Sequence, residues 1–363
     1  MTMTLARMLR NAPHVPMTTA WYLSDIAEAK GKQDLFTKQS PQKLKALREH
    51  AIIESALSSN RIEGVEIDPK RVKAVFAKRA ALHDRNEEEV RGYSDALRRI
   101  HEAPKKPDVS EETILHLHRT ARGEIWDAGK YKSKDVDIIE NYPDGRSRLR
   151  FKCVTAKKTP AAMATLCGQW SDAISGTDVH PLVSLGAFGL DFLCIHPFRD
   201  GNGRVSRLLL LLHCYHLGIE VGRYVSLESL IEQNKERYYE TLEQSSVGWH
   251  EGTNDPWPFV NYCLFIIKSA YREFEERVGQ VAAPRGAKTE LVQAAIDRTS
   301  GEFTLAAIER TCPGVSRDMI RRVLRDMQRA GRVECIGRGP GAKWRKSVLP
   351  LKEGKKRGNK KLR

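Results

Sequence analysis

The segment CIHPFRDGNGRVSRLLLLL, residues 194–212, constrains the fold more than any other part of the chain. The apolar helix that leads into it should end at His196, because Pro197 disfavours the helical conformation in the residue before it. A second helix should begin near Gly203 and continue into the leucine run. The sequence therefore predicts a tight loop between two buried helices.

The residue types of this loop favour an anionic ligand. Gly201 and Gly203 allow the backbone to bend closely around a ligand, so that N–H groups at the start of the second helix can point at an anion. Arg204 and Arg207 are three residues apart and can both bind phosphate oxygens from the first helical turn. The pattern GxxxxGK[ST] is absent, so an ordinary P-loop is excluded.

Two further side chains of the loop could take part in a reaction. A neutral imidazole at His196 could accept a proton from an attacking hydroxyl. The carboxylate of Asp200, together with the phosphates of a substrate, is a usual way to hold Mg²⁺. The alternative is a well-capped helix-loop-helix with a buried histidine and no chemistry.

These residues match the pattern HxFx[D/E]GNGRxxR, so the chain resembles the Fic family. The resemblance implies a mainly helical core, with transfer of AMP from the substrate ATP to a Ser, Thr or Tyr hydroxyl of a target protein. It implies that His196 is the base, Asp200 the Mg²⁺ ligand and Arg207 the contact of the γ-phosphate. The other matched residues would anchor the loop or surround the phosphates: Phe198, Gly201, Asn202, Gly203 and Arg204.

A second motif lies far upstream, at residues 59–64 (SNRIEG). It fits the inhibitory pattern [ST]xxxE[GN] of the Fic family at Ser59, Glu63 and Gly64. A Glu63 carboxylate paired with Arg207 would occupy the donor that the γ-phosphate needs, so we expect low activity of the native chain. The alternatives are that Glu63 is a solvated acid at a helix end, or that it positions water for the removal of AMP.

Two other segments resemble parts of Fic proteins. Residues 130–155 alternate apolar and charged side chains around Asp144-Gly145, which predicts a β-hairpin like the flap that holds target segments by strand addition. The stretch NKERYYETL resembles the part that encloses adenosine. It suggests base or ribose contacts at Asn234, Tyr238 and Tyr239, although simple helix packing also explains the two tyrosines.

The remaining pattern predicts a mainly α fold with helices over most of the chain and no regular element in residues 1–20. We expect an amino-terminal helical region (1–105) with an inhibitory helix at about 41–63, then a Fic core (106–280) and a linker (281–288). A winged helix-turn-helix domain (289–347) and a basic tail (348–363) would follow. The helices predicted between the inhibitory helix and the linker are 69–82, 86–101, 110–122, 160–175, 181–194, 202–217, 226–246 and 256–278.

The carboxy-terminal part is strongly basic. From Arg285 onward, 21 Lys and Arg stand against 8 Asp and Glu, so this part carries +13 of the net charge of +15. Three helices (289–298, 304–310 and 316–330) and two strands around a Gly-Pro-Gly tip predict the winged domain. Its third helix would expose arginines to nucleic acid, with Lys343 and Arg345 near the wing. Such modules also dock proteins. The chain could therefore instead be a DNA-binding regulator whose Fic site senses nucleotide.

Cysteine usage and hydropathy bear on the compartment in which the protein is expected. The seven cysteines are scattered without a CxxC pair, which favours reduced cysteines in a core. The leucine run at 208–212 is far too short to span a bilayer, and no signal-peptide pattern opens the chain. We therefore expect a cytoplasmic protein without membrane contact. The sequence leaves both a monomer and a homodimer open, and it does not name the target protein.

Overall fold

The computed structural model describes ten segments of the chain and divides it into two compact units, Met1–Ala283 and Pro284–Arg363. The predicted amino-terminal region and Fic core pack together as the first unit. The predicted linker falls largely, and the basic tail wholly, outside the described residues. The described segments are 3–37, 41–77, 81–103, 106–141, 145–279, 287–299, 301–312, 315–337, 339 and 342–347.

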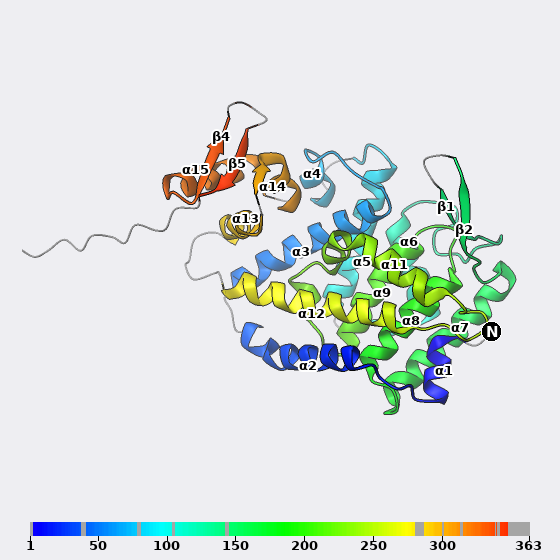
Figure 1. The fold of residues 1–363 in the computed structure, drawn as a ribbon. Helices are drawn as coiled ribbons and strands as arrows, with labels where there is room; N and C mark the ends of the chain where they lie inside the picture. Colours follow the sequence, from blue (N-terminus) through cyan, green and yellow to red (C-terminus); the bar gives the residue numbers. More distant parts are fainter. Residues whose placement is uncertain are drawn as a thin grey trace, which may run out of the picture. The chain divides into compact units, whose positions relative to one another are not determined.

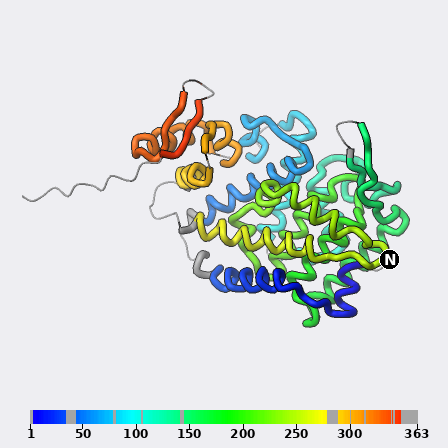
Figure 2. The backbone as a smooth tube through the Cα atoms, viewed as in Figure 1, coloured from blue at the N-terminus to red at the C-terminus, as the bar shows by residue number. Residues whose placement is uncertain are grey.

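The first unit is a helical bundle centred on α8 and α9, which both carry long apolar runs and are almost wholly buried. Helix α8 packs on α7, α9 and α12, whereas α9 also contacts α3, α5 and α6. Helix α2 lies along α12 at the edge of the bundle (Figures 1 and 2). The helices are α1 (Thr4–Arg10), α2 (Met17–Thr37), α3 (Pro41–Ile62), α4 (Val72–Phe76), α5 (Arg85–Glu102), α6 (Glu111–Arg122), α7 (Thr159–Ser175), α8 (Pro181–Ile195), α9 (Asn202–His216), α10 (Leu227–Gln233), α11 (Lys235–Ser246) and α12 (Trp257–Gly279), with short 3₁₀ turns η1 (Ala156–Lys158) and η2 (Val221–Arg223).

Most predicted helices of this unit are confirmed to within one or two residues at their ends, but three expectations were wrong. The helix predicted at 226–246 is broken into α10 and α11, because Asn234 leaves the helical conformation (φ −119°, ψ 32°). The helix predicted at 69–82 shrinks to α4 in the described residues. The first 20 residues contain α1 and the start of α2 rather than irregular chain.

The predicted hairpin is present as β1 (Ile138–Asn141) and β2 (Ser147–Phe151), which pair antiparallel. Ile138 faces Phe151, and Ile139 faces Leu149, with an irregularity between the two pairs. Of the predicted turn, Asp144 lies outside the described residues, while Gly145 has a left-handed φ of 83° that a glycine adopts without strain.

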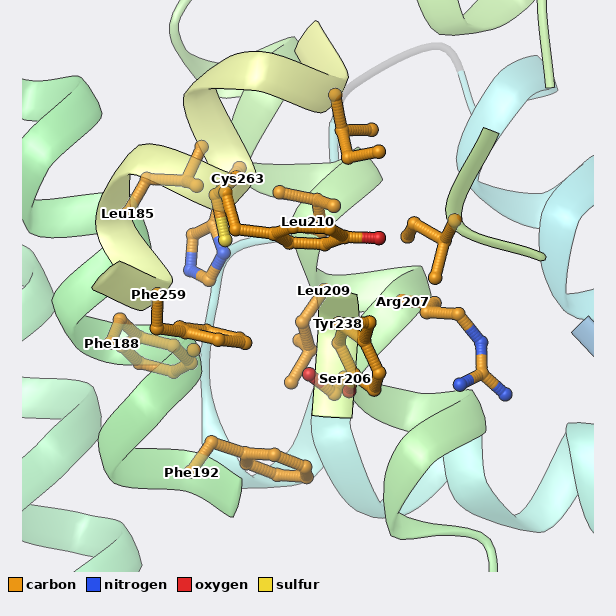
Figure 3. Close-up of a pocket in the computed structure, with 15 residues that line it drawn as sticks. Leu185, Phe188, Phe192, Ser206, Arg207, Leu209, Leu210, Tyr238, Phe259 and Cys263 are labelled. Atoms are coloured by element: carbon orange, nitrogen blue, oxygen red, sulfur yellow. The ribbon is translucent and has the colours of Figure 1, made fainter. Parts of the chain in front are cut away.

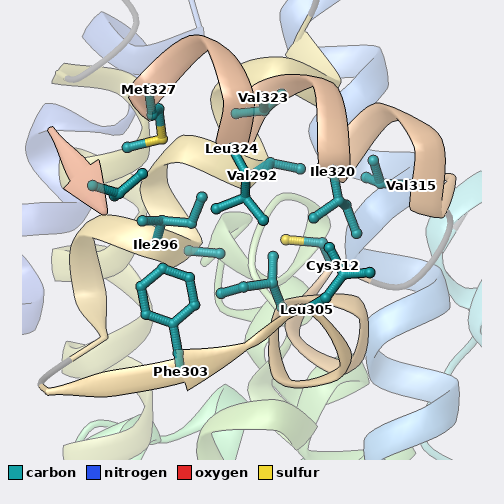
Figure 4. Packing of buried hydrophobic residues seen from close by; sticks show 13 residues of the cluster. Val292, Ile296, Phe303, Leu305, Cys312, Val315, Ile320, Val323, Leu324 and Met327 are labelled. Carbon is teal, nitrogen blue, oxygen red and sulfur yellow. The ribbon is translucent and has the colours of Figure 1, made fainter. Parts of the chain in front are cut away.

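The second unit combines three helices with a three-stranded antiparallel sheet of order β3-β5-β4. The three predicted helices and two predicted strands are confirmed, and β3 is an addition. Apolar side chains from all three helices and from β3 and β4 form its core (Figure 4). Assignment to the winged helix-turn-helix class stays a prediction. The elements are α13 (Ala287–Arg298), β3 (Glu302–Thr304), α14 (Leu305–Thr311), α15 (Arg317–Arg329), β4 (Val333–Ile336) and β5 (Lys343–Lys346).

The cysteine prediction is confirmed. All seven cysteines are free thiols; five are buried, and Cys167 and Cys335 are partly buried. Among the described residues, no helix is both long and apolar enough to cross a bilayer.

Helix α1, which is only seven residues long, depends on a buried carboxylate from the centre of the bundle. Helix α1 has no side-chain N-cap of its own. Instead, Asp191 of α8 accepts hydrogen bonds from the backbone N–H groups of Thr4 (2.9 Å) and Leu5 (2.8 Å) and from the indole of Trp249 (2.6 Å). Because short helices are marginal in isolation, this tertiary contact explains why no local pattern predicted α1.

Asp191→Ala should lower the free energy of unfolding by about 3 kcal/mol or more, because three buried donors lose their acceptor. The measurement is urea unfolding followed by tryptophan fluorescence, with Asp172→Ala, an exposed acid on α7, as the control. Equal unfolding free energies for the two variants would contradict the role of Asp191.

Candidate active site

The loop between α8 and α9 has the predicted form. Helix α8 ends at Ile195, and His196 follows in the left-handed conformation (φ 52°, ψ 62°). Gly201 is also left-handed (φ 85°), and α9 starts at Asn202, as predicted for the helix at 202–217. A Cβ atom on Gly201 would approach the Arg122 side chain to 3.0 Å. Both the conformation and the close approach therefore favour glycine at this position.

Side chains within and beneath the loop fix its shape. The Asn202 amide accepts a hydrogen bond from the Phe198 N–H (2.9 Å) and donates one to the Phe198 carbonyl (2.8 Å), so it closes the loop on itself. The buried Phe198 ring stacks on His118, with ring centroids 3.8 Å apart. His118 Nδ1 accepts from the Gly129 N–H (2.9 Å), which leaves Nε2–H to donate to the Asp200 carbonyl (3.0 Å). Phe198 is thus the predicted anchor.

The environment of His196 keeps its imidazole neutral. Burial, followed by the nearby charge of Lys132, lowers the pKa of His196 to about 4. Its Nδ1 lies 3.4 Å from the Leu193 carbonyl, which can only accept, so we assign the proton to Nδ1. Nε2 then carries a free lone pair, as a general base requires.

The predicted pair of Glu63 and Arg207 is present. Arg207 Nη2 lies 2.8 Å from Glu63 Oε1, and Arg207 also donates to the Ser59 hydroxyl (2.8 Å) and carbonyl (3.0 Å). Burial works against the charge of Arg207, but the Glu63 carboxylate outweighs it and raises the pKa of Arg207. A Cβ on Gly203 would lie 2.3 Å from Glu63 Oε1, so only glycine fits beside this ion pair.

Several contacts fix the end of α3 that presents Glu63. Gly64 adopts a left-handed φ of 79°, as expected for a residue that stops the helix. Arg61 forms a two-pronged ion pair with Glu232 of α10 (2.6 and 2.7 Å). Lys235 of α11 donates to the Ile62 carbonyl (2.8 Å), one of the carbonyls without a helical donor.

The other arginine of the motif, Arg204, takes part in a buried ion network. Its Nη1 lies 2.6 Å from Glu89 of α5 and 3.3 Å from the Asn60 amide oxygen. Glu89 also binds Arg122 (2.6 Å), and Arg122 in turn binds Asp200 (3.0 Å). Partial burial opposes ionisation of Asp200, but Arg122 and then Arg204 outweigh it and lower its pKa. The loop acid is therefore held ionised.

A cavity of about 330 Å³ opens in front of this loop, a size typical of small-ligand sites. A second, apolar cavity of about 30 Å³ lies behind it, and Arg207 and Tyr238 line both. Figure 3 shows the guanidinium of Arg207 pointing away from Phe188 and Phe259 of that apolar cavity. The larger cavity is lined by Glu63, His196, Gly203, Arg207, Tyr238 and Tyr239, together with hairpin residues Ile138, Ile139, Arg150 and Phe151, and by six further residues.

The structure thus brings six of the predicted site residues to one cavity and uses others elsewhere. Asn234 is not among the lining residues; its side-chain amide donates to the Leu230 carbonyl (2.8 Å) at the break between α10 and α11. Arg204 is almost fully buried and faces Glu89 rather than the cavity. A nucleotide contact is therefore not supported for Asn234, and Arg204 acts within the protein. The remaining predicted residues hold the loop or the inhibitory segment: Phe198, Asp200, Gly201, Asn202, Ser59 and Gly64.

Asp200 is the loop's one carboxylate that could meet a metal. Its side chain is 58% exposed. No group of three or more His, Cys, Asp and Glu side chains that could hold a metal occurs in the described segments. The residues therefore fit Mg²⁺ only when phosphate oxygens of a ligand supply further coordination.

Comparison with known sequences shows which family the segment around this site resembles. The sequence model of the Fic/DOC family matches residues 108–214, from just before α6 into α9. This segment of the chain is therefore similar to the Fic/DOC family. The loop, His196 and both motif arginines lie inside this match, whereas Glu63 and the hairpin-facing tyrosines Tyr238 and Tyr239 lie outside it.

The chain also has distant relatives among curated proteins. It is 24% identical over 270 residues to the protein adenylyltransferase Fic of Nematostella vectensis, a match that covers 71% of this chain and 56% of the relative. It is 23% identical over 228 residues to that of Drosophila melanogaster, covering 60% and 41%. The match thus spans about half the length of these relatives, or less.

Solved structures show the same fold. A Fic family protein from Desulfovibrio desulfuricans G20 superposes with a TM-score of 0.60 at 24% identity, over 94% of this chain and 99% of that one. A Fic domain containing signaling protein from Bacteroides thetaiotaomicron gives a TM-score of 0.56 at 21% identity, over 70% and 98%. The Fic fold therefore extends well beyond the matched segment of the sequence.

Three side chains that support the site were not predicted from the sequence. Glu89, His118 and Lys132 are buried polar residues in or beside otherwise ordinary helical or loop segments. Glu89 could have been found from the sequence, because it is an acid in the inward face of an amphipathic helix. A buried acid needs a cationic partner, so this position indicates a buried ion pair.

Glu89→Gln should lower the free energy of unfolding by about 3 kcal/mol, because Arg122 and Arg204 would remain buried with less compensating charge. The measurement is urea unfolding, with Glu112→Gln, an exposed acid on α6, as the matched control. A variant as stable as the control would show that the network does not stabilise the fold.

Proposed function

We propose that the chain transfers AMP from ATP to a Ser, Thr or Tyr hydroxyl of a target protein and of itself, and that Glu63 autoinhibits it. The observation that carries the proposal is the single cavity in which a neutral His196 and the paired Arg207 meet. The distant relation to protein adenylyltransferases supports it.

His196 would act as the general base. The target hydroxyl oxygen attacks the α-phosphorus, its proton passes to Nε2 of His196, and the bond to the β-phosphate oxygen breaks to release pyrophosphate. Because the pKa of His196 is about 4, the imidazole is ready to accept this proton at neutral pH. Alignment of the reacting groups would supply much of the catalysis.

The fit of a triphosphate rests on Arg207 and Gly203. Arg207 Nη1 is buried and has no hydrogen-bond partner in the described part of the chain. A buried donor of this kind is costly unless a ligand satisfies it. Glycine at position 203 leaves the start of α9 open, where helix N–H groups favour an anion. Tyr238 and Tyr239 would border the adenosine from the other side of the cavity.

Asp200 would hold Mg²⁺ bound to the phosphates, with Arg122 and Arg204 keeping its carboxylate ionised. When bound, this ion neutralises phosphate charge. The hairpin would hold the target: Ile139 (57% exposed) and Leu149 (56% exposed) offer apolar contacts next to the cavity, and Ile139 lines it.

Autoinhibition follows from competition for one guanidinium. While Glu63 occupies Arg207 Nη2, the γ-phosphate cannot take the same donor, and ATP binds with its α-phosphorus out of line for attack. The Glu63 side chain is 29% exposed and the Arg207 side chain only 2%, so the acid is the partner that can move away. Removal of AMP by water positioned at Glu63 is the alternative use of this site, and loss of label over time from pre-labelled protein would favour it.

Glu63→Gly should raise self-labelling by α-³²P-ATP about tenfold or more, which corresponds to ~1.4 kcal/mol, because Arg207 becomes available to the γ-phosphate. Glu66→Gly, which changes an exposed acid nearby, is the matched control and should leave labelling unchanged.

His196→Ala in the Glu63→Gly background should abolish labelling, since His196 is the loop residue whose free imidazole nitrogen faces the cavity as the proton acceptor. Equal labelling of Glu63→Gly and Glu66→Gly would refute autoinhibition by Glu63. Labelling that survives His196→Ala would refute transfer at this site and would favour a nucleotide sensor.

We also propose nucleic-acid binding by the second unit, on the basis of helix α15. Its buried stripe leaves five exposed arginines on the outer side. Three of them pair with acids of the unit, whereas Arg322 and Arg325 form no ion pair within the described segments. Lys343 and Arg345, expected at the wing, are instead paired with Glu302 and Glu334. In the described part of the second unit, Arg322 and Arg325 of this helix therefore offer charge that no ion pair neutralises.

The double variant Arg322→Ala/Arg325→Ala should weaken binding to duplex DNA. The slope of the logarithm of the binding constant against the logarithm of the salt concentration should fall by the amount expected for the loss of about two phosphate contacts. Fluorescence anisotropy over a range of salt concentrations measures both. Arg345→Ala is the control. No salt-dependent binding by the native chain, or an equal loss in the control, would contradict this second function.

A further inference from the structure

Lys132 contacts the chain on both sides of His196. Its backbone N–H donates to the Pro197 carbonyl (2.9 Å), and its ammonium donates to the Ile195 carbonyl (3.1 Å). The Lys132 residue is only 5% exposed. One buried lysine, from the loop that leads into the hairpin, thus holds the residues immediately before and after the proposed base.

The conformation of His196 makes such support necessary. Among the described residues, His196 is the one non-glycine residue with a positive φ, a conformation that is unfavourable for a side chain larger than glycine. The Ile195 carbonyl ends α8, where helical donors are missing and a cation is favoured. The Lys132 ammonium supplies both the donor and the charge.

The charge of Lys132 is not cancelled by a close acid. In the described segments, no carboxylate lies within ion-pair distance of its ammonium. Asp135 and Asp137 are nearby, but their carboxylates accept hydrogen bonds from the N–H groups of Ala156 (2.7 Å) and Cys153 (3.2 Å). A positive charge therefore remains beside the imidazole.

We propose that Lys132 is the positioning residue of His196: its two hydrogen bonds fix the left-handed backbone at the base, and its ammonium places a positive charge beside the imidazole. This rests on the proposed transfer reaction. Lys132 does not line the cavity, so it acts through His196 and not on the nucleotide.

Other charged groups near His196 and Lys132 also shift the pKa values of these two side chains. Glu63 from the end of α3 and Asp200 from the same loop raise the pKa of His196, but each by less than burial and Lys132 lower it. The thiol of Cys153 and the two acids Asp135 and Asp137 face Lys132 and favour its charge, against its burial. Removal of the lysine charge should therefore raise the pKa of His196, while burial still holds it below its usual value.

The test compares Lys132→Gln, Lys132→Met and Lys132→Arg in the full chain that also carries Glu63→Gly. Nuclear magnetic resonance of ¹³C,¹⁵N-histidine-labelled protein follows the titration of His196, whose signal is assigned by its loss in His196→Ala. The native chain should show His196 titrating near pH 4, and the Glu63→Gly parent should not titrate above it, because the Glu63 carboxylate raises this pKa. In Lys132→Gln, which keeps a donor but lacks the charge, the pKa should rise by about one unit, and Lys132→Arg should restore it.

Kinetics give the second readout. In Lys132→Met the kcat of self-labelling should fall about tenfold while the KM for ATP stays unchanged, because only the position of the base is affected. Lys130→Met, a change of an exposed lysine that binds the Trp126 carbonyl (2.9 Å), is the control.

An unchanged pKa of His196 in Lys132→Gln would overturn the proposal, and so would a KM that rises with kcat unchanged. If Lys132→Met does not fold, Lys132→Gln and Lys132→Arg still decide the matter. The resonance titration needs no transfer activity, so failure of this inference remains distinguishable from failure of the proposed function.

Discussion

Helix α9 begins with two buried guanidinium groups, and a buried cation is tolerated only beside an acid. Arg204 is satisfied by Glu89 from α5, and Arg207 by Glu63 at the end of α3. Both acids come from the amino-terminal part of the chain, outside the segment that matches the Fic/DOC family. These two ion pairs thus join the amino-terminal helices to the matched segment within one compact unit.

The two ion pairs differ in a way that suits two roles. Glu89 and Arg204 are both almost fully buried and lie away from the cavity, so their pair supports the loop in a fixed form. Glu63 is partly exposed and lines the cavity, so its pair with Arg207 can open to a phosphate. The same physical need for an acid thus gives a structural contact at one arginine and a proposed regulatory contact at the other.

The sequence predicted the parts of the site that are set by local chemistry. Pro197 and the two glycines mark the loop, and the motif around Glu63 was found because it is short and contiguous. Glu89 and Lys132 were not predicted, because their partners lie 115 and 63 residues away in the chain and no local pattern reports such contacts. Helix α1 was missed for the same reason, since its acceptor is Asp191. The break between α10 and α11 was missed because the residue type of Asn234 suits both a ligand contact and a helix break.

The central claim is that Glu63 occupies the guanidinium of Arg207 and so prevents Arg207 from binding the γ-phosphate of ATP. Isothermal titration of ATP and of AMP to the native chain and to Glu63→Gly tests it most directly, since AMP has no γ-phosphate. The account predicts that the substitution strengthens ATP binding by about tenfold and leaves AMP binding unchanged. The same change in affinity for both nucleotides, or no change for ATP, would contradict it.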